Sequence, residues 1–116
     1  MEYLNRIEIR GFVNNVTTYR SGDSQMVKFS VGTNRAYKDR EGTPVIELTW
    51  HDVLAWEGRN IPDLSKIVKG ARVYVQGRIQ KQHYTGQDGL ERYPVEIIAS
   101  RLMVIESDEQ LQPEMN

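Results

Sequence analysis

The 116-residue sequence contains no cysteine and only two histidines, His51 and His83. The lack of cysteine excludes a disulfide scaffold and thiolate metal sites. The sequence also has no triad spacing of acids and serines, no P-loop, no HExxH motif and no glycine-rich dinucleotide motif. Its aspartates are scattered among turns and do not form a metal-binding set. We therefore expect a protein that is not an enzyme and that uses no cofactor or metal.

Long apolar stretches are absent as well. No segment approaches the about 20 apolar residues that a membrane-spanning helix needs, and Met1–Arg6 lacks an apolar signal core. Together with the missing cysteines, this pattern favours the reducing cytoplasm. A chain of 116 residues can bury one hydrophobic core, so we expect a single domain.

Net charge is close to zero, with a formal value of −1 at pH 7. All 15 lysines and arginines precede residue 106, whereas the last eleven residues contain four acidic side chains and no basic one. Residues 1–105 therefore hold 15 basic and 12 acidic residues, a net charge of +3. This balance argues against a highly charged architectural protein. We expect residues 1–105 to form the domain and residues 106–116 to form a disordered acidic tail.

Alternation of apolar and polar residues, which is the period of a half-buried strand, dominates the rest of the sequence. It occurs at Ile7–Val13 and Val27–Val31, and further strands are expected over 45–56, 73–79 and 95–105. The segment 45–56 is apolar on both faces, which predicts a strand that is not exposed at an edge.

The segments between these strands predict turns and one short helix. Arg35–Pro44 is polar and is expected to connect two strands as a long hairpin loop. Asn60–Asp63 has the pattern of a helix start, and Leu64, Ile67 and Val68 would then share one helical face.

Three strands, a short helix and two strands therefore follow one another along the chain. Gly11 and Gly77 lie inside strands, where glycine marks a bulge or a sharp bend. A small sheet of five bent strands must close or be covered to protect its edges. The order predicts an all-β fold, a five-stranded Greek-key barrel of the oligonucleotide/oligosaccharide-binding (OB) type with one short helix between strands three and four.

Four aromatic residues do not fit the pattern of the barrel core. Tyr37 and Tyr84 lie in polar hairpin segments, and Trp50 and Trp56 are six residues apart on the third expected strand. An even spacing places both tryptophans on one face of a regular strand. Unpaired bases of any kind stack on such rings, so we predict a stacking site at all four positions. A purely structural role in the core stays open as the alternative.

Basic residues flank these rings. A single strand needs cations for its phosphates beside aromatic surfaces for its bases. The expected phosphate contacts are the five cations that flank the aromatic positions: Lys28, Arg35, Lys38, Arg78 and Lys81. The residues alone thus predict a domain that binds single-stranded DNA with little sequence preference.

Several motifs add a resemblance to a known family. They are Asn5–Ile7 with Gly11, Phe29–Asn34, Thr49–Val53, Val68–Ile79 and Arg92–Tyr93. The Trp-His pair, the Lys-Gly, Val-Tyr-Val and Gly-Arg run, and the hairpin spacing are specific in combination. On these motifs, from Asn5 to Ile105, the chain resembles the bacterial single-stranded DNA-binding proteins.

The resemblance implies an OB fold, a homotetramer and DNA wrapped over an aromatic surface in replication, recombination or repair, in the bacterial cytoplasm at the nucleoid. It carries the family's stacking positions onto Tyr37, Trp50, Trp56 and Tyr84, where three of the rings, all except Trp50, are of another aromatic type. It places His51 at a subunit interface. Without the resemblance, we would interpret His51 as a buried, hydrogen-bonded histidine.

The sequence departs from the family pattern after Ile105. Family members of full length continue through a Gly/Pro/Gln-rich linker to an acidic tip that ends in Pro-Phe and recruits other replication and repair proteins. Here residues 106–116 have the acidity but neither the linker nor the aromatic end. We therefore expect DNA binding without this means of recruitment, and a short paralogue, a mobile-element form and a truncated form remain open. The rival interpretation is a dimeric OB-fold adaptor of the primosome type that works mainly through protein contacts.

Overall fold

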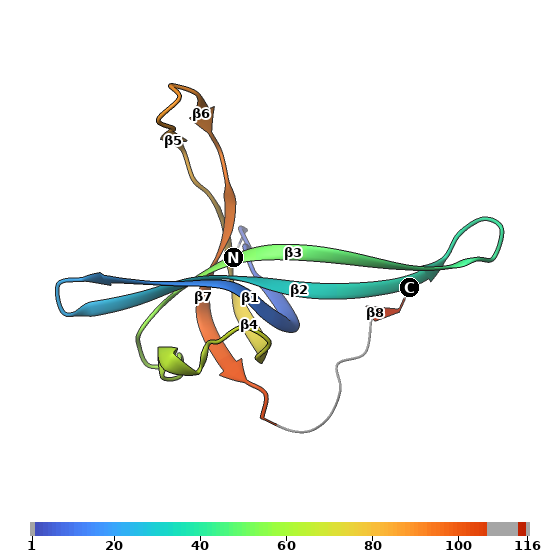
Figure 1. Ribbon diagram of the computed structural model, residues 1–116, viewed down its shortest axis with the longest axis horizontal. Coiled ribbons are helices and arrows are strands. Elements are labelled where there is room, and N and C mark those ends of the chain that lie inside the picture. The colour runs from blue at the N-terminus through green and yellow to red at the C-terminus, as the bar shows by residue number, and fades with distance from the viewer. Residues whose placement is uncertain (1, 107–113, 116) are drawn as a thin grey trace.

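The structure is a computed structural model and describes residues 2–106 and 114–115. Its elements are almost all strands, with a single 3-10 turn between β3 and β4 (Figure 1). In chain order they are β1 (Ile7–Ser21), β2 (Ser24–Lys38), β3 (Pro44–Trp56), η1 (Leu64–Lys66), β4 (Arg72–Lys81), β5 (Tyr84–Thr85), β6 (Glu91–Arg92), β7 (Val95–Val104) and β8 (Glu114–Met115).

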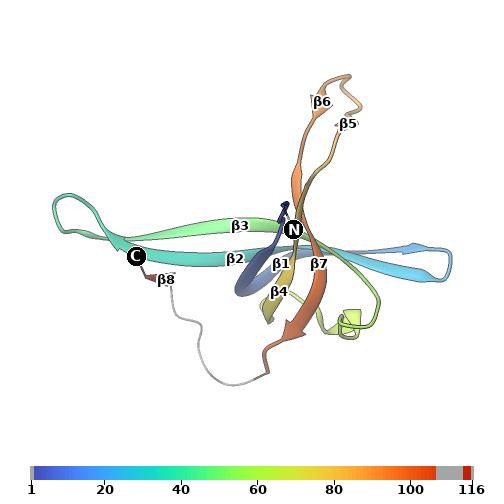
Figure 2. The ribbon, with the colours of Figure 1, turned by 180° about the vertical axis from the view of Figure 1, so that it is seen from behind.

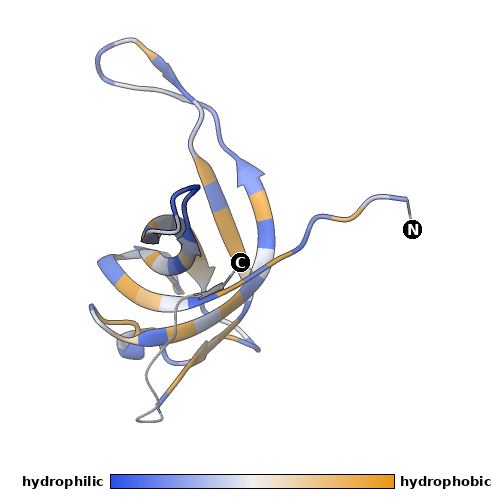
Figure 3. Cartoon of the chain, turned by 90° about the vertical axis from the view of Figure 1, so that its right-hand side faces the viewer, coloured by the Kyte–Doolittle hydropathy of each residue, from blue (hydrophilic) through white to orange (hydrophobic). Residues whose placement is uncertain are grey.

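Five of these strands form a closed ring. Their order is β1-β4-β7-β3-β2, and β2 pairs in turn with β1. All of these pairs are antiparallel except β3–β7. Apolar and polar bands alternate along the strands in Figure 3. The inward side chains of Val27, Phe29, Val53 and Val75 are at most 2% exposed. The predicted five-stranded OB barrel is confirmed.

Three hairpins extend beyond the barrel as arms (Figures 1 and 2). We call residues 17–25 of β1 and β2 the first arm, residues 33–49 of β2 and β3 the second arm, and residues 82–94 between β4 and β7 the third arm. The radius of gyration is 16.3 Å, whereas a compact domain of roughly this size has about 13 Å. The arms therefore extend the molecular surface well past the barrel that encloses the core.

The second arm corrects two sequence predictions. Only Asp39–Thr43 forms the connection, because Arg35–Lys38 continue β2 and pair with Pro44–Glu47. The part of β3 that belongs to the second arm is exposed to solvent, whereas the sequence predicts a strand that is not exposed at an edge. The Ile46 side chain, for example, is 66% exposed. Both differences arise because β2 and β3 continue past Gly32, where pairing with β1 ends.

The predicted helix is a single 3-10 turn. Asp63 caps it by accepting a hydrogen bond from the Ser65 backbone N–H at 3.0 Å. Leu64 and Ile67 are buried, but Val68 is 54% exposed and does not share their face. The reason is that Ile67 already has an extended backbone, which ends the turn before Val68. The described part of the chain holds no helix with the length and apolarity that a membrane crossing demands.

Of the two glycines predicted to mark a bulge or bend, Gly77 lies at one, whereas Gly11 lies where β1 changes its pairing partner and the register shift of β1 comes after Asn14. At Gly11 and Phe12, β1 passes from pairing with β4 to pairing with β2. Gly77 lies at a register shift between β4 and β7. Neither position has room for a side chain, because an added Cβ would lie 2.0 Å from the Gly32 carbonyl oxygen at Gly11 and 2.1 Å from the Ile98 carbonyl oxygen at Gly77.

Part of the predicted acidic tail lies within the described residues. Glu106 is 3.5 Å from Lys66. β8 pairs in parallel with Arg35–Ala36, on the second arm. Residues 107–113 and 116 lie outside the described residues, so the expectation of a disordered tail stays a prediction.

Candidate nucleic-acid interface

The outward side of β1, β2 and β3 is a continuous surface. β2 and β3 pair without a register shift from Met26 opposite Trp56 to Lys38 opposite Pro44. Odd-numbered residues such as Val27 and Val53 are buried in the barrel. Because side chains alternate along a strand, the even-numbered residues of β2 and β3 face outward. We call this surface, with the β1 residues paired to it, the outer face.

Both tryptophans lie on the outer face, as their spacing predicts. Trp50 is 45% exposed and Trp56 is 44% exposed, so neither belongs to the buried core. They are six positions apart on the strand, which corresponds to about 20 Å. Each presents an indole surface to solvent, and their role in stacking stays a prediction.

Each tryptophan belongs to a set of three residues that lie side by side on β1, β2 and β3. The Trp50 rung consists of Phe12, Gly32 and Trp50, and the Trp56 rung consists of Tyr19, Met26 and Trp56. Neither Phe12 nor Tyr19 is among the four aromatic positions that the sequence predicts as a stacking site. Their place follows only from the pairing register of three strands, including a register shift after Asn14.

Lys28 lies on the outer face between the two rungs, and it is already paired. Its Nζ atom is 3.1 Å from an Oε atom of Glu96, whose side chain is 8% exposed. The hydrogen bond to Glu96 raises the pKa of Lys28 above its ordinary value of 10.5, although burial opposes the shift. Of the five predicted phosphate contacts, Lys28 is therefore the one whose charge a nearly buried carboxylate neutralises.

Removing the Glu96 charge is expected to strengthen DNA binding. Glu96→Gln removes the carboxylate that lies 3.1 Å from Lys28 and leaves the weaker influence of Asp52, so the Lys28 cation is available to one more phosphate. The slope of log affinity against log salt should then steepen by about 0.7. A salt titration of the variant and of the unchanged protein measures this difference. An unchanged slope would show that DNA phosphates do not reach Lys28.

The other predicted residues of the second arm divide between its two faces. Lys38 is on the outer face, while Arg35 and Tyr37 lie on the opposite face by alternation. The Arg35 guanidinium is 4.8 Å from the centre of the Tyr37 ring, and it is 3.7 Å from Glu47. Tyr37 therefore lies on the opposite face of the sheet from the tryptophans. DNA bound to the tryptophans would have to pass around the second arm to reach Tyr37.

The third arm holds a separate aromatic group. Tyr84 is 50% exposed there. Lys81 lies 5.5 Å from the centre of the Tyr93 ring, and Tyr93 stacks on His83 at 4.9 Å. Sequence reasoning placed Tyr84 and Lys81 near each other but missed the stacked pair.

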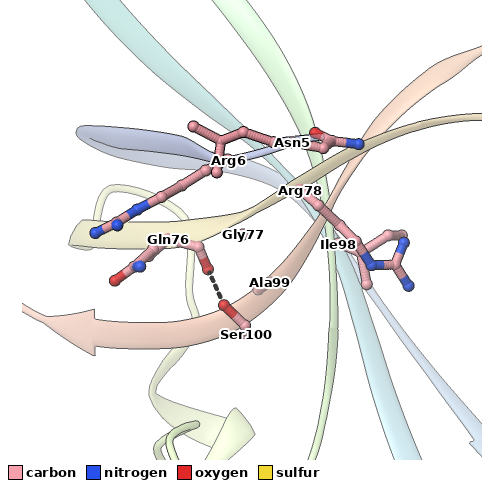
Figure 4. Close-up of a pocket in the computed structure, with 9 residues that line it drawn as sticks. Asn5, Arg6, Gln76, Gly77, Arg78, Ile98, Ala99 and Ser100 are labelled. Atoms are coloured by element: carbon pink, nitrogen blue, oxygen red, sulfur yellow. Dashed lines mark hydrogen bonds between the residues drawn. The ribbon is translucent and has the colours of Figure 1, made fainter. Parts of the chain in front are cut away.

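Arg78, the fifth predicted phosphate contact, is exposed on β4 and donates a hydrogen bond to Gln80 at 3.1 Å. It also borders an open hollow of about 510 Å³ between the chain before β1 and strands β4 and β7. Figure 4 shows Arg6 and Arg78 on opposite sides of this hollow. The nearby Asn5 side chain makes two hydrogen bonds to the Ile79 backbone, at 2.8 and 2.9 Å. None of the four aromatic residues predicted to stack on bases lines this hollow.

His51 is half-buried on β3, opposite Val31. Its Nε2 atom is 2.9 Å from the Thr33 hydroxyl oxygen, which matches the hydrogen-bonded histidine expected from the residues alone. Burial lowers the pKa of His51 below its ordinary value of 6.5, although the nearby Asp52 charge opposes the shift. Its predicted place at a subunit interface stays a prediction.

The lowered pKa of His51 predicts a fold that weakens in acid. Above pH 6.5 the histidine is neutral in both the folded and unfolded chains, and its contribution is complete. Below pH 6.5 the unfolded chain binds a proton first, so stability falls as the pH drops through the folded pKa. Urea unfolding at about pH 7.5 and about pH 5.5 should show this loss. His51→Gln should reduce it, with His83 present in both proteins as a common background.

Comparison with known proteins identifies the relatives of this chain. A sequence model of the single-strand binding protein family matches residues 4–105. A single-stranded DNA-binding protein of Neisseria meningitidis is 32% identical over 89 residues, which cover 75% of this chain and 50% of that protein. Its counterpart from Xanthomonas campestris is also 32% identical over 89 residues, covering 77% and 52%. The chain thus spans about half the length of these curated relatives.

Solved structures give the same grouping. The Plasmodium falciparum SSB in complex with ssDNA superposes with a TM-score of 0.73 at 29% identity, covering 91% of this chain and 98% of that one. A deletion mutant of the single-stranded DNA binding protein from Thermus aquaticus also gives 0.73, at 20% identity, over 90% of this chain and 52% of the other. The second likeness shows the fold alone.

Proposed function

Since the chain belongs to the single-strand binding protein family, we propose that it binds and coats single-stranded DNA with little sequence preference, in replication, recombination or repair. The proposal is one of binding and not of catalysis. The observation that supports it most is the outer face, where two half-exposed tryptophans lie on the same face of β3, six positions apart along one continuous sheet surface. Bases of any kind can stack on these rings, which favours binding without sequence readout.

Charge supports the same proposal. The predicted phosphate contacts Lys38, Arg78 and Lys81 are exposed, and they lie on different arms or at the base of an arm. Lys38 follows Tyr37 on the second arm, and Lys81 lies 5.5 Å from the centre of the Tyr93 ring at the third arm, so a strand that crosses between these arms would meet a cation on each side. Counterion release from the phosphates would make binding strongly dependent on salt.

We also propose a homotetramer that works in the bacterial cytoplasm. Support comes from family membership and from Tyr3 and Leu4, which are each 85% exposed on the chain before β1 and would gain cover from another subunit. Sedimentation should give four times the chain mass of 13.4 kDa. A stable monomer at micromolar concentration would contradict the tetramer. The dimeric adaptor is not favoured, because the matched relatives are named as single-stranded DNA-binding proteins.

A direct binding comparison tests the function. A labelled oligo(dT) should bind with rising anisotropy at low salt, and an oligonucleotide of mixed sequence and equal length should bind with a similar affinity. A duplex of that mixed sequence should bind far more weakly, because its bases are already stacked and paired. Equal affinity for the duplex would contradict the proposal and would indicate binding through phosphates alone.

A further inference from the structure

Phe12 and Trp50 touch across an intervening strand. Their ring centroids are 5.3 Å apart and their planes meet at 79°, an edge-to-face contact. Phe12 is on β1 and Trp50 is on β3, and each is paired with Gly32 of β2. Adjacent strands lie about 4.8 Å apart, so the two rings meet above the middle strand.

Gly32 is what leaves room for this contact. An added Cβ would lie 2.8 Å from Cζ of Phe12 and 2.9 Å from Cζ3 of Trp50. Its backbone is not in the left-handed region, so glycine is needed here for space and not for conformation. Any side chain at this position would be driven between the two rings.

We propose that Phe12 is a positioning residue, which holds the Trp50 indole in the orientation that receives a base. The inference rests on the proposed function, because it requires Trp50 to stack on DNA. A free indole that must be ordered on binding loses rotamer freedom, whereas an indole already held by a neighbouring ring loses less. Edge-to-face contacts between aromatic rings have a preferred geometry and can supply this restraint.

The Trp56 rung provides an internal comparison. Within the part of the chain that the structure describes, the Trp56 ring makes no aromatic contact of this kind, and its neighbour on β2 is the flexible Met26. Phe12 should therefore affect Trp50 and leave Trp56 unchanged. The two tryptophans would differ in how far they are ordered before DNA arrives.

The test uses Phe12→Leu, which keeps an apolar side chain but removes the ring, and Phe12→Tyr, which keeps the ring. Trp56→Phe is present throughout, so that all indole emission comes from Trp50. Phe12→Leu should weaken oligo(dT) binding by about 3- to 10-fold and should lower the emission anisotropy of Trp50 in the free protein. Phe12→Tyr should restore both, and Gly32→Ala, which forces the rings apart, should reproduce both losses.

Two further variants separate positioning from general damage. In a Trp50→Ala background, Phe12→Leu should have no further effect on affinity. Phe29→Leu, which alters the other phenylalanine, in the core, should lower the unfolding midpoint without changing the affinity or Trp50 anisotropy of the folded protein. If Phe12→Leu changes neither quantity, or weakens binding equally without Trp50, the positioning role is overturned. If Trp50→Ala itself binds DNA normally, the DNA site at Trp50 fails, and the role of Phe12 fails with it.

Discussion

Replacing Trp50 and Trp56 together by alanine is expected to weaken single-stranded DNA binding by about 2–6 kcal/mol. Each base stacked on an aromatic ring contributes about 1–3 kcal/mol, as judged by alanine substitution. The two rings are separated by about 20 Å along β3, and losses at sites that far apart add nearly independently. The folded barrel should survive, because both indoles are only half-buried on the outer face. Equilibrium titration with labelled oligo(dT) measures the loss.

Matched variants control for the loss of exposed apolar surface. Val68 and Met103 are 54% and 47% exposed, similar to the tryptophans, but lie after η1 and on β7. Val68→Ala and Met103→Ala should leave the affinity within the error of the titration. Full affinity in the double tryptophan variant would place the DNA site elsewhere on the molecule.

Substituting alanine for Gly11 is expected to destabilise the barrel by about 3 kcal/mol, at the upper end of the usual range for overpacking. The new Cβ would lie 2.0 Å from the Gly32 carbonyl oxygen, which is backbone and cannot rotate away. β1 would have to move away from β2 where the ring of strands closes. Urea unfolding monitored by circular dichroism measures the change in the free energy of unfolding.

Substitutions at two other glycines serve as comparisons for Gly11→Ala. Gly77→Ala should cost a similar amount, because its Cβ would lie 2.1 Å from the Ile98 carbonyl oxygen. Gly58→Ala should be nearly neutral, since the nearest atom to its Cβ is the Trp56 carbonyl oxygen at 3.9 Å. If Gly11→Ala were as stable as Gly58→Ala, the close approach of β1 and β2 would be wrong.

The order of strands and the face of the tryptophans could be predicted because they depend on local periodicity. Trp50 and Trp56 share a face because β3 stays regular between them, with no register shift against β2. The Trp50 rung could not be predicted, since it depends on the register of three strands and on a shift after Asn14. The pairing of Lys28 with Glu96 joins residues far apart in the sequence, and no spacing reveals it.

How far the strands continue into the arms could not be predicted from the sequence either. The polar residues of the second arm indicate a loop, yet they pair in a regular ladder as far as Lys38 and Pro44. The alternation of side chains indicates which residues share a face of a strand, but it does not indicate where the strand extends past the barrel. The apolar pattern of 45–56 therefore predicts a strand that is not exposed at an edge, whereas Ile46 and Leu48 on the second arm are exposed.

In the proposed binding mode, single-stranded DNA lies on the outer face across both rungs. Two single-tryptophan proteins, Trp56→Phe and Trp50→Phe, test this placement, because each leaves one indole to report. A base stacked on an indole quenches its emission, so saturation with oligo(dT) should quench a large part of the fluorescence of both proteins. If DNA binds, as followed by the anisotropy of a labelled strand, while neither indole changes its emission, then DNA does not lie on the outer face.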